Sequence, residues 1–175
     1  MNQRKAAEPE DRDYSFQERK KMSSGKYHLD ENEIPEGFQI FEERLEVAGV
    51  RFRKDDAAAF ANATEGWLEL ERDPKNRHNL NAIKVIGVSK GVFGTKRYFI
   101  GYVPKVISGA IIEGRYWDKI RLRLLKTYVS DRGYVEFLFQ ILGPKSGKSN
   151  FQRFKSRQKK GDGKGGKKKG EPDEK

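Results

Sequence analysis

Short segments in which apolar and polar residues alternate recur through the middle of the chain, and this pattern constrains the fold more than any other feature. Alternation with a period of two is typical of a strand with one buried and one exposed face. It is clearest in the predicted strand over residues 133–141, where Val135, Phe137, Phe139 and Ile141 fall on one side. The chain is therefore expected to build its core from strands.

Turn-forming residues separate this segment from the other predicted strands. Those strands cover residues 38–50, 67–71, 82–88, 98–103 and 119–129. Two short helices are predicted, one capped by Asp55 over residues 55–64 and one that begins at Pro104 and stops at Gly114. About six short strands with two small helices favour a mainly β (α+β) fold, as a small, partly closed β-barrel or a strongly coiled sheet.

Composition divides the chain into one domain and two polar ends. Residues 38–143 are predicted to form the domain. Residues 1–37 are polar, and residues 144–175 form a basic tail rich in lysine and glycine. Both ends are predicted to be disordered, because they contain too few apolar side chains to offset the chain entropy lost on folding.

Charge favours a polyanionic partner. The formal net charge is +11; counting Lys and Arg against Asp and Glu assigns about −2 to residues 1–40, about +5 to residues 41–143 and about +8 to the remainder. A basic tail on its own is equally typical of a solvated segment that keeps a protein soluble. A basic domain shifts the expectation towards nucleic acid.

Several classes of protein are disfavoured. The chain contains no cysteine and two histidines, His28 and His78, so disulfides and thiolate metal sites are absent and no catalytic set or cofactor site is predicted. Residues 143–149 resemble a phosphate-binding loop, but three residues separate the two glycines where that motif has four. No apolar stretch approaches the roughly 20 residues of a membrane span, and an intracellular protein is expected.

Three segments occur in the order and approximate spacing of a HIRAN domain. They are VAGVRFR (residues 47–53), LERDPKNRHNLNAIKV (residues 70–85) and IGYVPK (residues 100–105). The resemblance covers residues 44–142 and implies a small barrel related to oligonucleotide-binding (OB) folds. Domains of this family occur alone in bacterial proteins and fused to helicase-like remodelling proteins in eukaryotes, where they capture single-stranded DNA at a 3′ end.

The same resemblance implies site residues in the first two segments. Arg51, Phe52 and Arg53 align with a platform for phosphates and bases, although Arg53 replaces the family's second aromatic residue. Burial of Phe52 in the core remains an alternative, because strand alternation places it on the same side as the preceding valine. Phe52 can otherwise stack on a base, and Arg53 can contact a phosphate.

In the loop segment, His78 and Asn79 align with a pair that meets the terminal nucleotide, whose acidic member receives the 3′ hydroxyl. His78 can stack on a base. Asn79 is neutral, so it loses the charge-assisted hydrogen bond of a carboxylate. Asn76 belongs to the frame of this loop and either contacts the sugar or shapes the turn by bonding to the backbone.

The third segment contributes Tyr102 and Lys105. Tyr102 is predicted to meet a base, and Lys105 to hold a phosphate at the start of the second helix, where free backbone amides favour an anion. A tyrosine hydroxyl at the barrel rim and a solvated lysine are the alternatives. Lys119, Arg121 and Arg123 form a stripe that is either a second contact for the strand or simply an exposed strand face.

Together these features predict a non-enzymatic DNA-binding protein that takes single-stranded DNA, with 3′-end capture left open, while its basic tail adds non-specific phosphate contacts. One alternative is an RNA-binding module, or a protein that holds duplex through its tail. Another is an adaptor that recruits a separately encoded helicase or nuclease.

Overall fold

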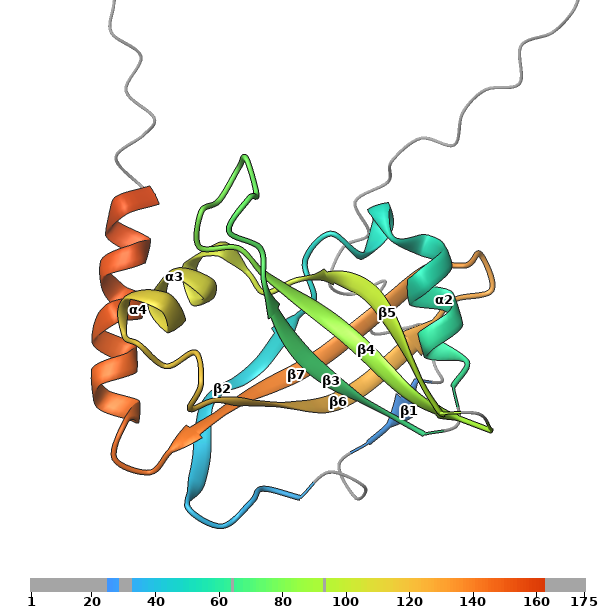
Figure 1. The fold of residues 1–175 in the computed structure, drawn as a ribbon, viewed down its shortest axis with the longest axis horizontal. Coiled ribbons are helices and arrows are strands. Elements are labelled where there is room, and N and C mark those ends of the chain that lie inside the picture. Colours follow the sequence, from blue (N-terminus) through green and yellow to red (C-terminus); the bar gives the residue numbers. More distant parts are fainter. Residues whose placement is uncertain (1–24, 29–32, 64, 93, 163–175) are drawn as a thin grey trace, which may run out of the picture.

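The computed structural model describes residues 25–28, 33–63, 65–92 and 94–162. Its strands are β1 (Lys26–Tyr27), β2 (Phe38–Glu46), β3 (Gly66–Arg72), β4 (Ile83–Gly91), β5 (Gly94–Tyr102), β6 (Arg121–Val129) and β7 (Val135–Pro144). A 3-10 helix, η1 (Val50–Phe52), precedes α2 (Lys54–Ala61), and the remaining helices are α3 (Lys105–Glu113) and α4 (Lys148–Asp162). The described part of the chain is therefore mainly β with three α-helices (Figure 1).

The strands form two antiparallel sheets. One has the order β1-β6-β7-β2 and the other the order β3-β4-β5. Among the described residues no strand of one sheet pairs with a strand of the other, although an isolated antiparallel bridge joins Ala48, just after β2, to Tyr102 of β5; the predicted barrel is therefore not confirmed. Leu68 and Leu70 of β3 and Trp117 and Leu122 are among the side chains that line an open space between β3 and β6.

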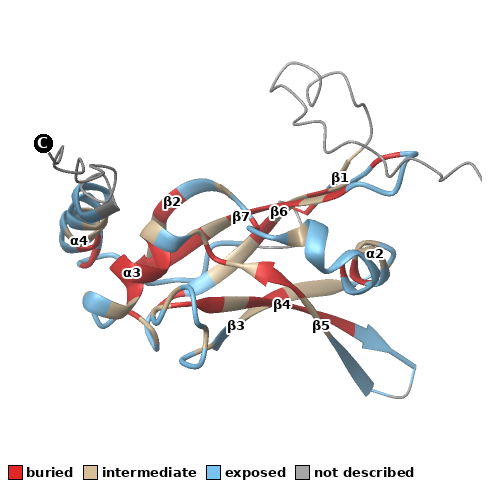
Figure 2. Cartoon of the chain, turned by 90° about the horizontal axis from the view of Figure 1, so that it is seen from above, coloured by how far each residue is buried: buried red, intermediate tan, exposed pale blue. Residues whose placement is uncertain are grey.

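The core lies between the two sheets. Val135, Phe137, Phe139 and Ile141 of β7 are all buried, which confirms the face predicted from their alternation (Figure 2). Buried side chains of β4 and β5 approach them from the second sheet. The two predicted helices are present as α2 and α3, and each adds apolar side chains to this core, Phe60 in the case of α2.

The prediction of disorder from residue 144 is wrong for residues 148–162, because α4 packs onto the domain beside α3 (Figure 1). Phe151 is fully buried, with its ring centre 5.0 Å from that of Phe41 and 5.8 Å from that of Tyr116. Lys155 Nζ lies 2.7 and 2.6 Å from the two carboxylate oxygens of the buried Glu42. The buried ring of Phe151 and a partly buried ion pair thus anchor a helix whose composition resembles a solvated tail. The rest of the predicted tail, residues 163–175, lies outside the described residues.

The predicted N-terminal segment also contributes to the fold. Lys26 and Tyr27 pair with β6, and the buried His28 places Nε2 3.0 Å from the Thr127 hydroxyl. Residues 26–28 therefore belong to the folded domain rather than to a disordered end, because β6 offers them a free edge for pairing. Residues 1–24 lie outside the described residues. β2 begins at Phe38, the residue at which the sequence places the start of the domain.

The sequence predicts neither a membrane-spanning segment nor a metal site. In the described segments no helix combines the length and the apolar composition that crossing a membrane requires. Over the same residues, no group of three or more histidine, aspartate or glutamate side chains is placed to hold a metal ion.

Candidate nucleic-acid interface

A 3-10 turn presents Arg51 and Phe52 to solvent. It follows Gly49, whose φ of 78° lies in the left-handed region that glycine adopts without strain. Hydrogen bonds from the Phe52 N–H to the Gly49 carbonyl (3.1 Å) and from the Arg53 N–H to the Val50 carbonyl (2.8 Å) close the turn. Phe52 is 69% exposed, and the Arg51 guanidinium carbon lies 4.7 Å from the centre of its ring. Burial of Phe52 in the core is therefore excluded, because the turn replaces the strand that would point it inward.

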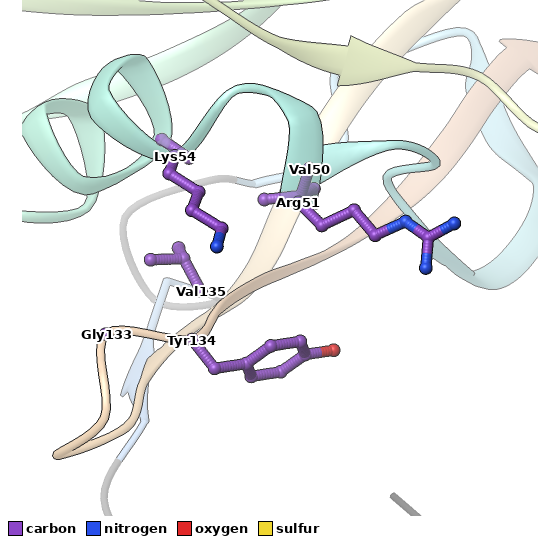
Figure 3. A pocket seen from close by; sticks show the side chains of 7 residues that line it. Val50, Arg51, Lys54, Gly133, Tyr134 and Val135 are labelled. Atoms are coloured by element: carbon purple, nitrogen blue, oxygen red, sulfur yellow. The ribbon is translucent and has the colours of Figure 1, made fainter. Parts of the chain in front are cut away.

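Arg51 also lines a small pocket of about 40 Å³. The lining residues are Val50, Arg51, Lys54, Ala57, Gly133, Tyr134 and Val135. Figure 3 shows the side chains of Lys54 and Arg51 opposite Tyr134, which lies between the turn after β6 and the start of β7. Two cations beside an aromatic ring suit a nucleotide, whose base stacks while its phosphate is held. The sequence did not predict Tyr134, because its loop is remote from Arg51 along the chain, and it did not predict Lys54, although Lys54 directly follows the predicted triplet.

Arg53 lies apart from Arg51, on the outer face of the three-stranded sheet. Its guanidinium carbon is 4.4 Å from the centre of the Phe99 ring, and Lys84 Nζ is 5.5 Å from the same centre. Tyr102 meets Phe99 in a T-shaped contact with ring centres 5.2 Å apart. The predicted triplet is thus divided between two surfaces. Phe99 was not predicted, although alternation in β5, where Ile100 is buried, is the signal that would have identified it.

Tyr102 joins the three segments that the sequence singled out. Its backbone exchanges two hydrogen bonds of 2.8 Å with Ala48, which brings the chain before η1 against the end of β5. Its hydroxyl donates to Asp73 Oδ2 at 2.9 Å, at the start of the β3–β4 loop (residues 73–82). The chain then enters α3 at Lys105. Tyr102 was expected to meet a base, and in this structure its hydroxyl holds the loop in place.

The asparagines of the β3–β4 loop are also engaged within the protein. Asn76 Oδ1 accepts the backbone N–H groups of His78 (3.0 Å) and Asn79 (3.1 Å). Asn79 Oδ1 accepts the N–H of Asn81 at 3.0 Å, and its amide nitrogen donates to Ser108 Oγ at 3.2 Å. Both side chains therefore shape the loop, and Asn79 also fastens it to α3.

Lys105 lies close to this loop. It is exposed at the first position of α3, one turn before Ser108, which contacts Asn79. Figure 1 shows the β3–β4 loop beside α3. His78 is likewise exposed on the loop.

The structure brings the predicted segments together around Tyr102. Some of their predicted site residues are exposed, whereas others make contacts within the protein. Five predicted residues are exposed in or beside these segments: Arg51, Phe52, Arg53, His78 and Lys105. Asn76, Asn79 and Tyr102 make contacts within the protein, and Arg53 lies over Phe99. In the basic stripe of β6, Arg121 lies 5.8 Å from the centre of the Phe38 ring and Arg123 donates to Gln140 Oε1 at 3.1 Å.

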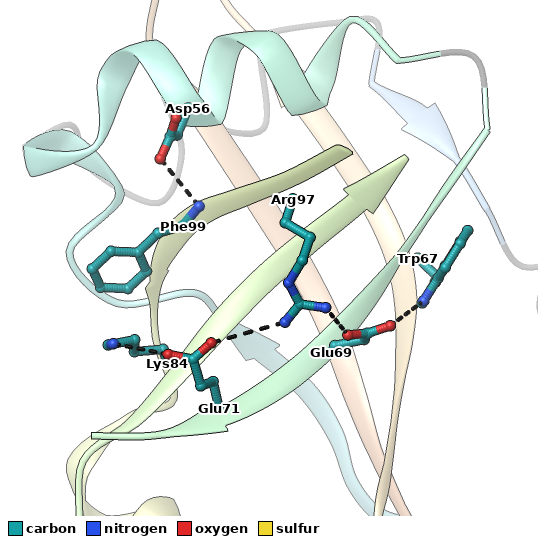
Figure 4. A network of polar contacts seen from close by, with 7 residues as sticks. All are labelled: Asp56, Trp67, Glu69, Glu71, Lys84, Arg97 and Phe99. Carbon is teal, nitrogen blue, oxygen red and sulfur yellow. Dashed lines mark hydrogen bonds and ion pairs between the residues drawn. The ribbon is translucent and has the colours of Figure 1, made fainter. Parts of the chain in front are cut away.

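A chain of polar contacts crosses the outer face of β3, β4 and β5 (Figure 4). Trp67 Nε1 donates to Glu69 Oε1 at 2.9 Å, and Arg97 donates to the other oxygen of Glu69. Arg97 also lies 3.8 Å from Glu71, which accepts a 3.0 Å hydrogen bond from Lys84. That bond raises the pKa of Lys84. Two cations of this face, Arg97 and Lys84, are thus paired with carboxylates, whereas Arg53 on the same face lies over Phe99.

Glu69 is predicted to make the stability of this sheet depend on pH. The hydrogen bond from Trp67, together with the bond and charge of Arg97, lowers the pKa of Glu69, although burial opposes the shift. A carboxyl group whose pKa is lower in the folded state stabilises the fold above its unfolded pKa, and this contribution is lost as the pH falls through the folded pKa. The effect is expected to be small, since the Glu69 side chain is 37% exposed.

An NMR titration of the Glu69 side-chain carboxyl checks this prediction. Its midpoint is expected below that of an unstructured glutamate, and Trp67→Phe, which removes the donor, is expected to move the midpoint upward. A midpoint at the ordinary value in the unmodified protein would contradict the prediction.

No protein-family model matches the chain, and no curated protein matches its sequence at a significant level. Among solved structures, the chain is similar to the HIRAN domain of human HLTF, at 18% sequence identity and a TM-score of 0.44, over 71% of this chain and 95% of that chain. It is also similar to the HLTF HIRAN domain solved by NMR in its DNA-bound conformation, at 18% identity and a TM-score of 0.42, over 70% and 92% of the two chains. These are domains of the family whose motifs the sequence resembles.

Proposed function

We propose that this protein is a non-enzymatic nucleic-acid-binding protein that takes single-stranded DNA across the surface formed by η1, the β3–β4 loop and the start of α3. The observation that carries the proposal is the exposed pair of Arg51 and Phe52 beside Lys54 and Tyr134. An unpaired nucleotide offers both a base for the exposed ring and a phosphate for the neighbouring cations.

The residues divide into three roles. Arg51, Lys54 and Lys105 hold phosphates, and Phe52, Tyr134 and His78 meet bases. Asn76, Asn79 and Tyr102 keep the segments in register, through the hydrogen bonds already described. The resemblance of the sequence to HIRAN domains and the net charge of +11 support the same reading. The basic segment that follows β7 adds phosphate contacts that do not depend on sequence.

Fluorescence anisotropy with labelled single-stranded DNA tests the proposal. If about four to six phosphates are neutralised, log affinity should fall with log salt concentration at about −0.7 per phosphate. Competition with RNA and with duplex of the same length, at fixed salt, separates single-stranded DNA binding from the two other polynucleotide partners. A full-length protein without measurable affinity for any of the three would overturn the proposal and favour an adaptor for a helicase or nuclease.

A double substitution, Arg51→Ala with Phe52→Ala, is expected to raise the Kd for single-stranded DNA about tenfold, because it removes one phosphate contact and one stacking surface. The matched control is Lys96→Ala, which removes an exposed cation from β5 outside the proposed surface. The control should change the Kd less than about twofold. Equal losses in the two variants would mean that only the total charge matters.

A further inference from the structure

The β3–β4 loop presents an apolar side chain to solvent from a well-defined frame. Leu80 is 76% exposed at this loop. The loop around it is closed by backbone hydrogen bonds from Ala82 to Asn79 (2.9 Å) and from Asp73 to Ala82 (3.0 Å), in addition to the asparagine contacts. An exposed leucine is common on flexible surfaces. A leucine held outward by such a frame is preorganised for a partner.

Asn79 bonds within the protein, whereas the side chains directly before and after it in the chain are exposed. Asn79 is fastened to Ser108 of α3 through its amide nitrogen and to the backbone of Asn81 through its oxygen. The residues on either side, His78 and Leu80, are both exposed. The loop therefore directs Asn79 towards α3 and leaves His78 and Leu80 exposed to solvent.

The charge of the loop suits a strand with exposed bases. Residues 74–82 contain no acidic residue, and Lys75 and Arg77 are exposed there. The acidic residue at the start of the loop, Asp73, accepts the Tyr102 hydroxyl and lies 3.4 Å from the Asn76 amide nitrogen. The carboxylate is thus engaged inside the loop, while the cations remain outside.

We infer that Leu80 and His78 contact bases within a single strand, that Lys75 and Arg77 hold the adjoining phosphates, and that this contact does not require a strand end. The inference rests on the proposed function and specifies its substrate as internal unpaired segments. Recognition of a terminal hydroxyl by the asparagines of this loop would need a side-chain oxygen directed at that hydroxyl. In this loop Asn76 Oδ1 already accepts two backbone N–H groups, and Asn79 is turned towards α3.

Three oligonucleotides of one sequence test the inference: a linear strand with a free 3′ hydroxyl, the same strand with a 3′ phosphate, and a circle. The full-length protein is expected to bind all three with Kd values within about threefold of one another. A preference of more than about tenfold for the free hydroxyl overturns the inference.

The substitution Leu80→Ala is the second test of the inference. It should raise the Kd for all three oligonucleotides by about three- to tenfold, since the contact is made with bases along the strand. Val92→Ala is the matched control, because Val92 is 93% exposed in the β4–β5 hairpin and also loses an apolar side chain. If Leu80→Ala binds as tightly as this control, Leu80 has no part in binding and the inference fails.

Asn79→Ala distinguishes a frame residue from a residue that reads the strand end. Loss of the frame should weaken binding of all three oligonucleotides by the same factor, whereas loss of end recognition would weaken only the linear strand with the free hydroxyl. The thermal unfolding midpoint of each variant reports whether the fold is retained. Failure of the unmodified protein to bind any of the three would refute the proposed function itself, while binding with end preference or without a Leu80 effect refutes only the inference.

Discussion

Phe151→Ala is expected to lower the free energy of unfolding by about 3 to 5 kcal/mol, because it removes a fully buried aromatic ring and leaves a cavity. The ring packs against Phe41 of β2 and Tyr116, which follows α3. Tyr116 in turn donates to the Gly147 carbonyl at 2.9 Å, directly before α4. The loss should therefore loosen α4 from the domain. Urea denaturation of the full-length protein measures the effect.

Phe154→Ala is the matched control for this variant. Phe154 lies on the same helix, but it is only partly buried against the edge of the core. Its removal is expected to cost less than half as much as the removal of Phe151. A loss below about 1 kcal/mol for Phe151→Ala would show that α4 unfolds independently of the sheets.

Gly101→Ala is expected to destabilise the protein by about 3 to 5 kcal/mol through strain and overpacking combined. Gly101 has a φ of 153°, which disfavours other residues. A methyl group at this position would overlap the Ala48 carbonyl oxygen and the Val47 side chain. The only relief is to move the chain before η1 away from β5, so the variant should also weaken DNA binding by displacing Arg51 and Phe52.

Gly161→Ala controls for the general effect of replacing glycine. An added methyl group at Gly161 meets nothing, and the residue lies in α4, where alanine has the higher helix propensity. This variant should therefore be as stable as the unmodified protein or slightly more stable. Thermal denaturation and anisotropy titrations on both variants check the two parts of the prediction. An unchanged Kd in Gly101→Ala would show that the bridge to Ala48 does not position the site.

Elements that depend on local pattern were predictable. The period of two in residues 133–141 identified β7 and the face that meets the core, because alternate side chains share one face of a strand. Leu138 and Leu142 on the other face are buried as well. Pro104 and Gly114 bounded α3 closely, since proline favours a helix start and glycine a helix end. The segment at Arg51 was harder, because a single glycine, Gly49, converts an apparent strand into a turn.

The sequence predicted which segments form the candidate site, but not which of their side chains are exposed and which bond within the protein. The residues that engage the loop are far from it in sequence: Tyr102 and Ser108 each lie 29 positions from their partners, Asp73 and Asn79. The same is true of Tyr134 beside Lys54 and of Phe99 beneath Arg53. Nothing in a local pattern reveals whether an asparagine is directed at solvent or at a helix.

The order of residues along the chain was thus enough to locate six of the seven described strands, two helices, the basic character and the three motif segments, because each depends on neighbouring residues or on total charge. Packing over long separations settled three further matters: whether the strands close into a barrel, whether residues 148–162 join the core, and which site side chains remain exposed. The reason is that burial of Phe151 and the bonds of Asn79 and Tyr102 each require partners that come close only after the chain has folded.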